Sequence, residues 1–236
     1  MKTTLITSVL PLITLMAASY THADTFQRVS TWTTANNLAM AGKDYQTETS
    51  AEIITASHDG KTLIYSDSPL GGIGFVDISN ASAPKAAGFL ALDGEPTSVS
   101  VTNRYVLAGV NTSSSYTAPS GTLATVDLAK QKIISRCDLG GQPDSVAVSR
   151  DKKYVAIAIE NERDEDLNDG VLPQLPAGNL VIIPLKKGKP VCHKKTMVDL
   201  TGLANIAPSD PEPEFVDFNN NNEIVITLQE NNHIAV

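Results

Sequence analysis

The chain has 236 residues, a formal net charge of −8 at pH 7 and a sequence pI of 4.9. An acidic chain repels phosphate backbones, so its charge argues against nucleic acid as a partner and favours cations or cationic partners. The two cysteines, Cys137 and Cys192, can form a disulfide in an oxidising compartment or remain as buried free thiols. The sequence leaves both alternatives open because it does not give the Cα separation.

The N-terminal segment 1–23 has the pattern of a secretory signal peptide. Lys2 precedes an apolar run over residues 5–18, and small residues stand at the positions of a cleavage site. The run is shorter than the roughly 20 residues that cross a bilayer, and an uncleaved anchor is the alternative. We expect an exported protein, periplasmic or extracellular, that begins at Asp24 and has no membrane span after cleavage. Removing Lys2 with the leader changes the net charge from −8 to −9.

A short pattern recurs along the chain as "PTSVSV" from Pro96, "PDSVAV" from Pro143 and "PEFVDF" from Pro213, with a weaker copy, "AEIITA", from Ala51. Alternation with period two predicts a strand with one buried face. A short turn follows each copy, and then a more continuously apolar strand such as "YVLAGV" or "YVAIAI". Third and fourth strands follow, for example "LATVDL" and "KIISRCDL".

Four strands repeated every 45 to 70 residues, without a helical pattern between them, predict the blades of a β-propeller. A β-sandwich is the alternative, but it does not require the same four-strand order to recur. We therefore predict an all-β propeller of four-stranded blades over residues 51–236, with the last blade truncated. About three and a half blades are present, as the N-terminal part of a larger ring. Within the lead-in 24–50, "FQRVSTWTT" (26–34) resembles the outer strand that completes the last blade of a ring.

The long connections of this predicted propeller all fall on one face. That face carries the loops between second and third strands and the loops between blades, and its long segments are 42–50, 111–121, 160–178 and 201–214. The turns expected on the opposite face are short, such as "TNR" and "RDKK". Long loops gathered on one face are typical of the binding face of a repeat architecture.

Two sets of polar residues are predicted on this face. The exits of the second strands carry the oxygen donors Asp67, Asn111, Glu160 and Glu230, which with Arg163 form the predicted ligand-binding set. The second positions of the inner strands, at the mouth of the central channel, are Glu52, Thr97, Asp144 and Glu214. Like charges in a concave site raise one another's pKa or recruit a cation, and hard oxygen ligands favour Ca²⁺ or Mg²⁺. The alternative is that the acidic residues only decorate turns and strand ends.

The segment "DEDLNDG" adds a second candidate for calcium. It places Asp164, Asp166 and Asn168 at alternate positions, like the start of an EF-hand loop, but Gly170 comes one residue late and Leu175 replaces the bidentate glutamate. A looser calcium loop remains compatible with the pattern. The predicted metal ligands are thus Glu52, Asp144, Glu214, Asp164, Asp166 and Asn168. The sequence contains no G-x-S-x-G, P-loop, G-x-G-x-x-G or H-E-x-x-H motif.

The segments "DGEPTSVSV", "GGQPDSVAVSRDKKYVAIAIENERDEDLNDG" and "PEPEFVDFNNNNEIVITLQENNHIAV" resemble secreted bacterial β-propellers. The chain resembles the group described as having esterase-like activity of phytase, and surface-layer and choice-of-anchor propellers look similar. The resemblance implies a seven-bladed ring and a phosphoester or ester substrate. Calcium-dependent propeller phytases bind substrate over cation clusters on one face.

Two functions follow from these observations. The first is an exported propeller, monomeric at full length, that binds a cation and a small-molecule ligand or protein on the face with the long loops, without a catalytic motif. The alternative is a calcium-dependent phosphoesterase or esterase of the hydrolase class. In it Glu160, Glu230, Asp144 and Glu214 would hold Ca²⁺, and a bound water would be the nucleophile.

Overall fold

The computed structural model describes residues 26–164 and 166–236. The predicted signal peptide, 1–23, lies outside the described residues. The strands are β1 (Ile54–Ala56), β2 (Thr62–Asp67), β3 (Gly72–Asp77), β4 (Lys85–Ala91), β5 (Glu95–Val101), β6 (Tyr105–Asn111), β7 (Gly121–Asp127), β8 (Lys132–Asp138), β9 (Pro143–Val148), β10 (Tyr154–Ile159), β11 (Asn179–Lys186), β12 (Lys189–Pro190), β13 (Thr196–Asp199), β14 (Pro213–Phe218), β15 (Ile224–Leu228) and β16 (His233–Ala235). The 3-10 helices are η1 (Thr34–Asn37), η2 (Leu167–Gly170) and η3 (Cys192–Lys194). No helix in this described part is long and apolar enough to cross a membrane.

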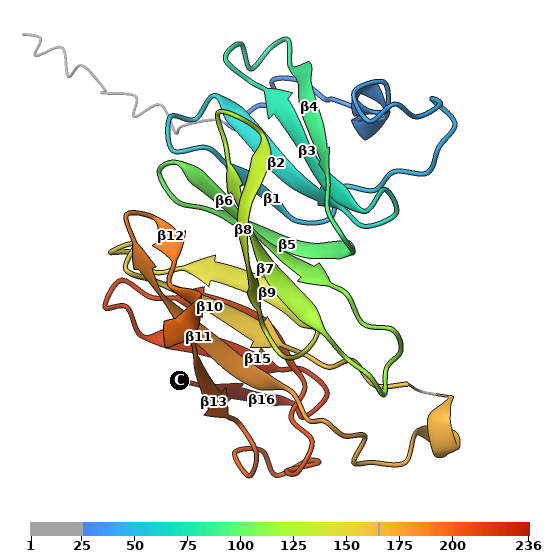
Figure 1. Cartoon of the computed structure of the whole chain (residues 1–236), viewed down its shortest axis with the longest axis vertical. Coiled ribbons are helices and arrows are strands. Elements are labelled where there is room, and N and C mark those ends of the chain that lie inside the picture. Colours follow the sequence, from blue (N-terminus) through green and yellow to red (C-terminus); the bar gives the residue numbers. More distant parts are fainter. Residues whose placement is uncertain (1–25, 165) are drawn as a thin grey trace, which may run out of the picture.

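The strands form four antiparallel sheets in chain order, as predicted. Blade 1 is β1–β4, blade 2 is β5–β8, blade 3 is β9–β11 with both β12 and β13 paired to β11, and blade 4 is β14–β16. The inner strands β1, β5, β9 and β14 contact one another in that order, and the sheets follow one another down the molecule (Figure 1). This arrangement confirms the predicted partial propeller. The blade count of a complete ring stays a prediction.

The hydrophobic core consists of three clusters, and each cluster lies between two adjacent blades. Val106 of β6 packs in the cluster with blade 1, whereas its neighbour Leu107 packs in the cluster with blade 3. In the same way β10 directs Ile157 toward blade 2 and Ala156 toward blade 4. Because side chains alternate along a strand, a second strand covered on both faces must be apolar at successive positions. This explains the continuous apolar runs of the second strands.

Serine side chains join the inner strands of adjacent blades. The Val146 N–H donates to Ser98 Oγ at 3.0 Å, and the Val216 N–H donates to Ser145 Oγ at 3.2 Å. Both N–H groups lie at register shifts of their own strands, just after the proline of the repeat. A bulge leaves the ladder incomplete at that point, so the preceding blade satisfies the free donor. In blade 4, Phe215 takes the place of the serine and is exposed.

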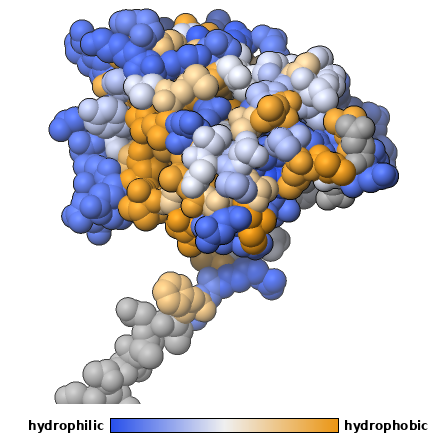
Figure 2. Space-filling model, turned by 90° about the horizontal axis from the view of Figure 1, so that it is seen from below, coloured by the Kyte–Doolittle hydropathy of each residue, from blue (hydrophilic) through white to orange (hydrophobic). Residues whose placement is uncertain are grey.

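The free face of blade 4 is apolar. Figure 2 views the molecule from the end where blade 4 lies, and hydrophobic side chains gather there. Phe215, Ile234 and Val236 are each more than half exposed. The described part of the chain thus exposes an apolar sheet face at this end.

The lead-in packs against blade 1. Residues 26–33 form no strand, but Trp32 lies edge-on to Tyr65 with ring centroids 6.3 Å apart. Buried Asn37 donates to Tyr65 Oη at 3.0 Å and to the Phe75 carbonyl at 3.1 Å. The closing-strand role of 26–34 stays a prediction. The first inner strand is also shorter than expected, because β1 begins at Ile54 rather than at residue 51.

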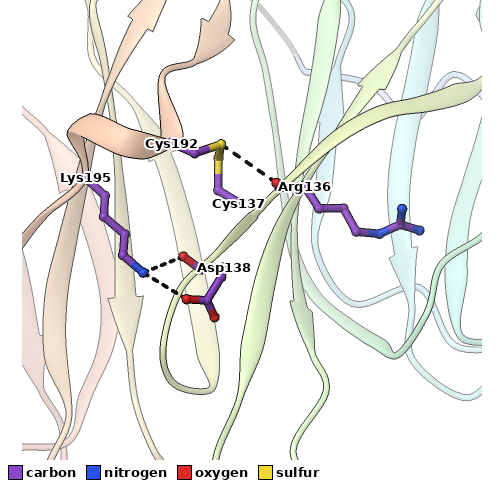
Figure 3. The surroundings of a disulfide bond; sticks show 5 residues. All are labelled: Arg136, Cys137, Asp138, Cys192 and Lys195. Carbon is purple, nitrogen blue, oxygen red and sulfur yellow. Dashed lines mark hydrogen bonds and ion pairs between the residues drawn. A yellow bond between two sulfur atoms is a disulfide. The ribbon is translucent and has the colours of Figure 1, made fainter.

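Cys137 and Cys192 form a disulfide, with their Cα atoms 5.2 Å apart. It joins the outer strand of blade 2, β8, to η3 of blade 3 (Figure 3). Beside it, Lys195 Nζ donates to the Asp138 carbonyl at 2.7 Å and to Asp138 Oδ2 at 3.1 Å. The two blades are therefore joined at their outer edges as well as at their inner strands.

We expect replacement of both cysteines by alanine to lower the free energy of unfolding by about 2–4 kcal/mol, because the disulfide restricts a loop of 55 residues in the unfolded chain. Urea unfolding of the oxidised protein and the variant measures the difference. Adding a reducing agent should lower the urea midpoint of the wild-type protein, because it breaks the disulfide. It should leave the urea midpoint of the variant unchanged. Equal midpoints for oxidised wild type and variant would contradict the expectation.

Candidate functional site

An acidic cleft of about 690 Å³ opens on the face that carries the long connections. Its lining residues are Tyr116, Glu160, Glu162, Arg163, Asp164, Asp166, Gly170, Leu172, Gln174, Glu212, Glu214, Gln229 and Glu230. Seven of these are carboxylates, and Arg163 is the one cationic side chain among them. Apart from Gln229 and Glu230, which follow β15, the lining comes from the connections 111–121, 160–178 and 201–214, which the sequence predicted to share one face. The structure confirms that prediction.

Asparagines after the second strands turn the chain into these connections. Asn161 is buried in the left-handed region, with φ +52°. Its Oδ1 accepts from the Gln142 N–H at 2.9 Å, and its Nδ2 donates to the Pro176 and Ala177 carbonyls at 3.1 Å. In blade 4, Asn231 Oδ1 accepts from the Glu212 N–H at 2.9 Å in the same manner. Each asparagine ties a long connection to the residue that directly precedes the inner strand of its own blade.

Asp67 has this tying role in blade 1. It is fully buried and accepts from the Ser50 N–H at 3.0 Å and from the Thr49 hydroxyl. Asn111 shapes the connection of blade 2 by accepting from the Ser113 N–H at 2.9 Å. Both residues were predicted to bind ligand, but the structure gives them hydrogen bonds that hold the connections, and neither lines the acidic cleft.

Arg163, also predicted to bind ligand, lies in the cleft but is already paired. Its Nε is 3.0 Å from Glu212 Oε2 and 3.3 Å from Asp210 Oδ2. Its Nη2 donates to the Asp210 carbonyl at 2.6 Å, and its backbone N–H donates to Glu212 Oε1 at 3.2 Å. The guanidinium is therefore surrounded by carboxylates of the chain itself. One guanidinium offsets only part of the negative charge that the seven lining carboxyl groups can carry.

Burial and mutual repulsion change the acidity of two inner carboxyls. Burial, followed by the charges of Glu214, Glu162 and Glu52, raises the pKa of Asp144 to about 7. Burial, followed by Asp144 and Glu214, raises the pKa of Glu160 to about 9. Carboxyls with such pKa values retain protons near neutral pH, which reduces the repulsion inside the cluster. The predicted crowding of inner-strand carboxylates at the channel mouth is thus present.

The predicted metal ligands are only partly brought together. Glu214, Asp164 and Asp166 line the cleft, and Glu52 accepts from the Ser68 hydroxyl at 2.6 Å. Asp164 Oδ1 accepts from the Asp166 N–H at 3.0 Å, so one of its oxygens shapes its own loop. The side chain of Asn168 lies outside the described residues. Within the described part, no group of three or more acidic, histidine or cysteine side chains is arranged to hold a metal ion; calcium stays a prediction.

Sequence reasoning missed several lining residues. Glu162 accepts from Gln142 Nε2 at 3.1 Å, and Glu212 pairs with Arg163. The signal for Glu212 was its place directly before Pro213, which corresponds to Gln142 before Pro143 in the preceding repeat. Pairwise matching of the repeats would have found it.

Comparison with known proteins decides the family. Residues 52–207, well over half of the chain, match the choice-of-anchor I domain. The chain belongs to the choice-of-anchor I domain family. Choice-of-anchor domains are typical of secreted or cell-surface proteins, which fits the predicted export.

A structural relative of this choice-of-anchor I chain is hydrazine synthase of Kuenenia stuttgartiensis, with a TM-score of 0.54 and 17% sequence identity. The match covers 74% of the choice-of-anchor chain and 49% of the hydrazine synthase chain, so the chain spans about half of that relative's length. At this identity the likeness shows the fold alone. No curated protein matches the sequence.

Replacing Asp144 with asparagine and Glu160 with glutamine should stabilise the choice-of-anchor I chain above pH 7. Both pKa values are raised by folding, so the folded state holds more protons, and the free energy of unfolding falls as the pH rises from the unfolded values near 4 through about 7 and about 9. We expect the variant to match wild type near pH 4 and to exceed it at pH 9 by about 1–2 kcal/mol, discounted for partial exposure.

Thermal melts across this pH range, without divalent cations, measure the difference, with about 2–4 °C expected for each kcal/mol. A matched control is Asp217→Asn with Glu223→Gln, which removes two charges from exposed positions at the other end of blade 4. Parallel pH curves for wild type and the Asp144/Glu160 variant would refute the expectation.

Proposed function

We propose that this choice-of-anchor I protein is an exported binding propeller whose acidic cleft holds a cation and, through it, a ligand or partner. The observation that carries the proposal is the lining of the cleft. Seven carboxylates from blades 3 and 4 and their connections converge there, and the one lining cation, Arg163, is already paired with Asp210 and Glu212. The remaining charge is unfavourable until protons or a cation balance it.

Calcium suits this cleft better than a soft metal. Its ligands are oxygens in flexible arrangements that include carboxylates and water. Glu160 of blade 3 and Glu214 and Glu230 of blade 4 present carboxylates to one space. The protein part of the site would thus tie blade 3 to blade 4, with water completing the coordination.

The same lining favours a binding protein over a phosphoesterase. Recognition of a phosphoester relies on cationic side chains or metal ions that face the phosphate oxygens. Arg163 is the only lining arginine or lysine, and its guanidinium contacts two carboxylates. We therefore propose binding as the function and use turnover as a readout of the alternative.

Calcium is expected to raise the melting temperature of the full chain, since a ligand at a hundredfold excess over its Kd adds about 2.7 kcal/mol to the free energy of unfolding. The rise should be abolished by Glu160→Gln with Glu230→Gln. Thermal melts in CaCl₂ and in NaCl of equal ionic strength, with calorimetric titration of CaCl₂, measure it. Hydrolysis of p-nitrophenyl phosphate, assayed on the same samples, should be absent.

The matched control is again Asp217→Asn with Glu223→Gln, which changes the net charge equally and leaves the cleft intact. This control should respond to calcium like wild type. The proposal would be wrong if calcium did not raise the melting temperature of the wild-type protein. It would also be wrong if calcium raised the melting temperature of the cleft variant equally. Calcium-dependent turnover lost only in the cleft variant would instead support the phosphoesterase.

A further inference from the structure

The cations of this acidic chain gather at the end opposite the acidic cleft. The short turns there contain Lys61, Arg104, Lys130, Arg150, Lys152, Lys153, Lys186 and Lys187. The densest stretch is "KKGKPVCHKK" (186–195), which has five lysines and a histidine and no acid. Its first half is the hairpin between β11 and β12. Asp127 and Asp151 pair with Arg104 and Lys153 at this end, but lysine and arginine outnumber the acids of the short turns, so its charge is opposite in sign to that of the cleft.

A basic pocket of about 680 Å³ lies over this hairpin. Its lining residues are Arg104, Tyr105, Lys186, Lys187, Lys189, Pro190, Val191, Cys192 and His193. These lining residues include no carboxylate, although the chain has 26 acidic and 18 basic residues. A pocket lined by one sign of charge attracts the opposite sign.

The pocket is held in shape by neighbouring blades. Tyr105 of β6 is buried, and its ring centroid lies 5.5 Å from the Arg104 guanidinium and 5.2 Å from Lys189 Nζ. The Thr102 hydroxyl of blade 2 donates to the Gly188 carbonyl in the hairpin at 3.3 Å. Cys192, at the end of the pocket, is held by the disulfide to β8. The lysines therefore project from an anchored hairpin rather than from a loose loop.

Most of the positive charge in the pocket is uncompensated. Arg104 pairs with Asp127 at 3.0 Å. Lys186, Lys187 and Lys189 are exposed, and no ion pair to a carboxylate links any of the three to another described residue. Three ammonium groups are thus available to an anion from outside.

We propose that the basic pocket binds phosphate groups, either the headgroups of an anionic lipid surface or a soluble polyphosphate. Lysine ammonium groups bind phosphate as point charges from several directions, and several close to one anionic surface add to the attraction. An anionic surface also repels the acidic face. The charge arrangement would therefore turn the basic pocket toward such a surface and the acidic cleft away from it. This proposal is independent of cation binding in the cleft.

Co-sedimentation of the full chain with vesicles tests the lipid source, with phosphatidylcholine alone compared with phosphatidylcholine containing phosphatidylglycerol. We expect binding only to the anionic vesicles, lost at high salt. Lys186→Glu with Lys187→Glu should weaken it about tenfold or more. Calorimetric titration with tripolyphosphate tests the soluble source: binding there without vesicle binding, sensitive to the same variant, assigns a soluble phosphate ligand.

The control is Arg28→Glu with Lys43→Glu, which makes the same change of charge at two exposed positions of the lead-in, outside the short turns of the basic end. The control should bind the probes like wild type, and unchanged melting temperatures establish that both variants fold. The proposal is overturned if wild type binds neither probe, or if the pocket variant binds as wild type does. It is also overturned if the pocket variant and the control lose probe binding equally. Tighter binding of duplex DNA than of either probe would overturn it as well.

Discussion

The contact between one inner strand and the next governs this structure. At the bulges after Pro143 and Pro213 a backbone N–H lacks its ladder partner, and a serine of the preceding blade accepts it, Ser98 in one case and Ser145 in the other. A buried N–H left without a partner would cost about 1–3 kcal/mol. The apolar clusters between blades set the spacing of the sheets, and the serine bonds set the position of one inner strand along the next. The residues before each serine, Thr97 and Asp144, therefore lie close to those of the next blade.

The acidic cleft follows from this arrangement. Neighbouring inner strands carry Asp144 and Glu214 at the same position of the repeat. The packing of the blades therefore brings these two acidic side chains together although their charges repel each other. The high pKa values of Asp144 and Glu160 are the electrostatic consequence of that packing. The short turns at the other ends of the same strands carry lysine and arginine. The molecule thus has an excess of acidic residues at one end and an excess of lysine and arginine at the other.

The sequence was sufficient to predict the blades but not the detailed role of each polar residue. Alternation and repeat order predicted β5, β9 and β14 with close boundaries, because burial on one face is a local pattern. Asp67 and Glu160 looked equivalent as polar residues at strand exits. In space Asp67 corresponds to Asn161, since each accepts from the backbone N–H of the residue directly before a copy of the repeat, Ser50 or Gln142. Asp67 is the last residue of β2, whereas Asn161 lies two residues beyond the end of β10. This difference in the length of the strand exits hid the correspondence in the sequence.

By itself, the sequence determined the strand order, the side on which the long connections lie and the excess of acid on that side, since these depend on local periodicity and loop length. Only the tertiary structure decided that Arg163 pairs with Asp210 and Glu212, that Cys137 joins Cys192, and that Tyr105 lies beside Arg104 and Lys189. Most of these contacts join residues more than forty positions apart. Their geometry depends on how the blades pack against one another. A local sequence pattern carries no information about contacts between residues so far apart in the chain.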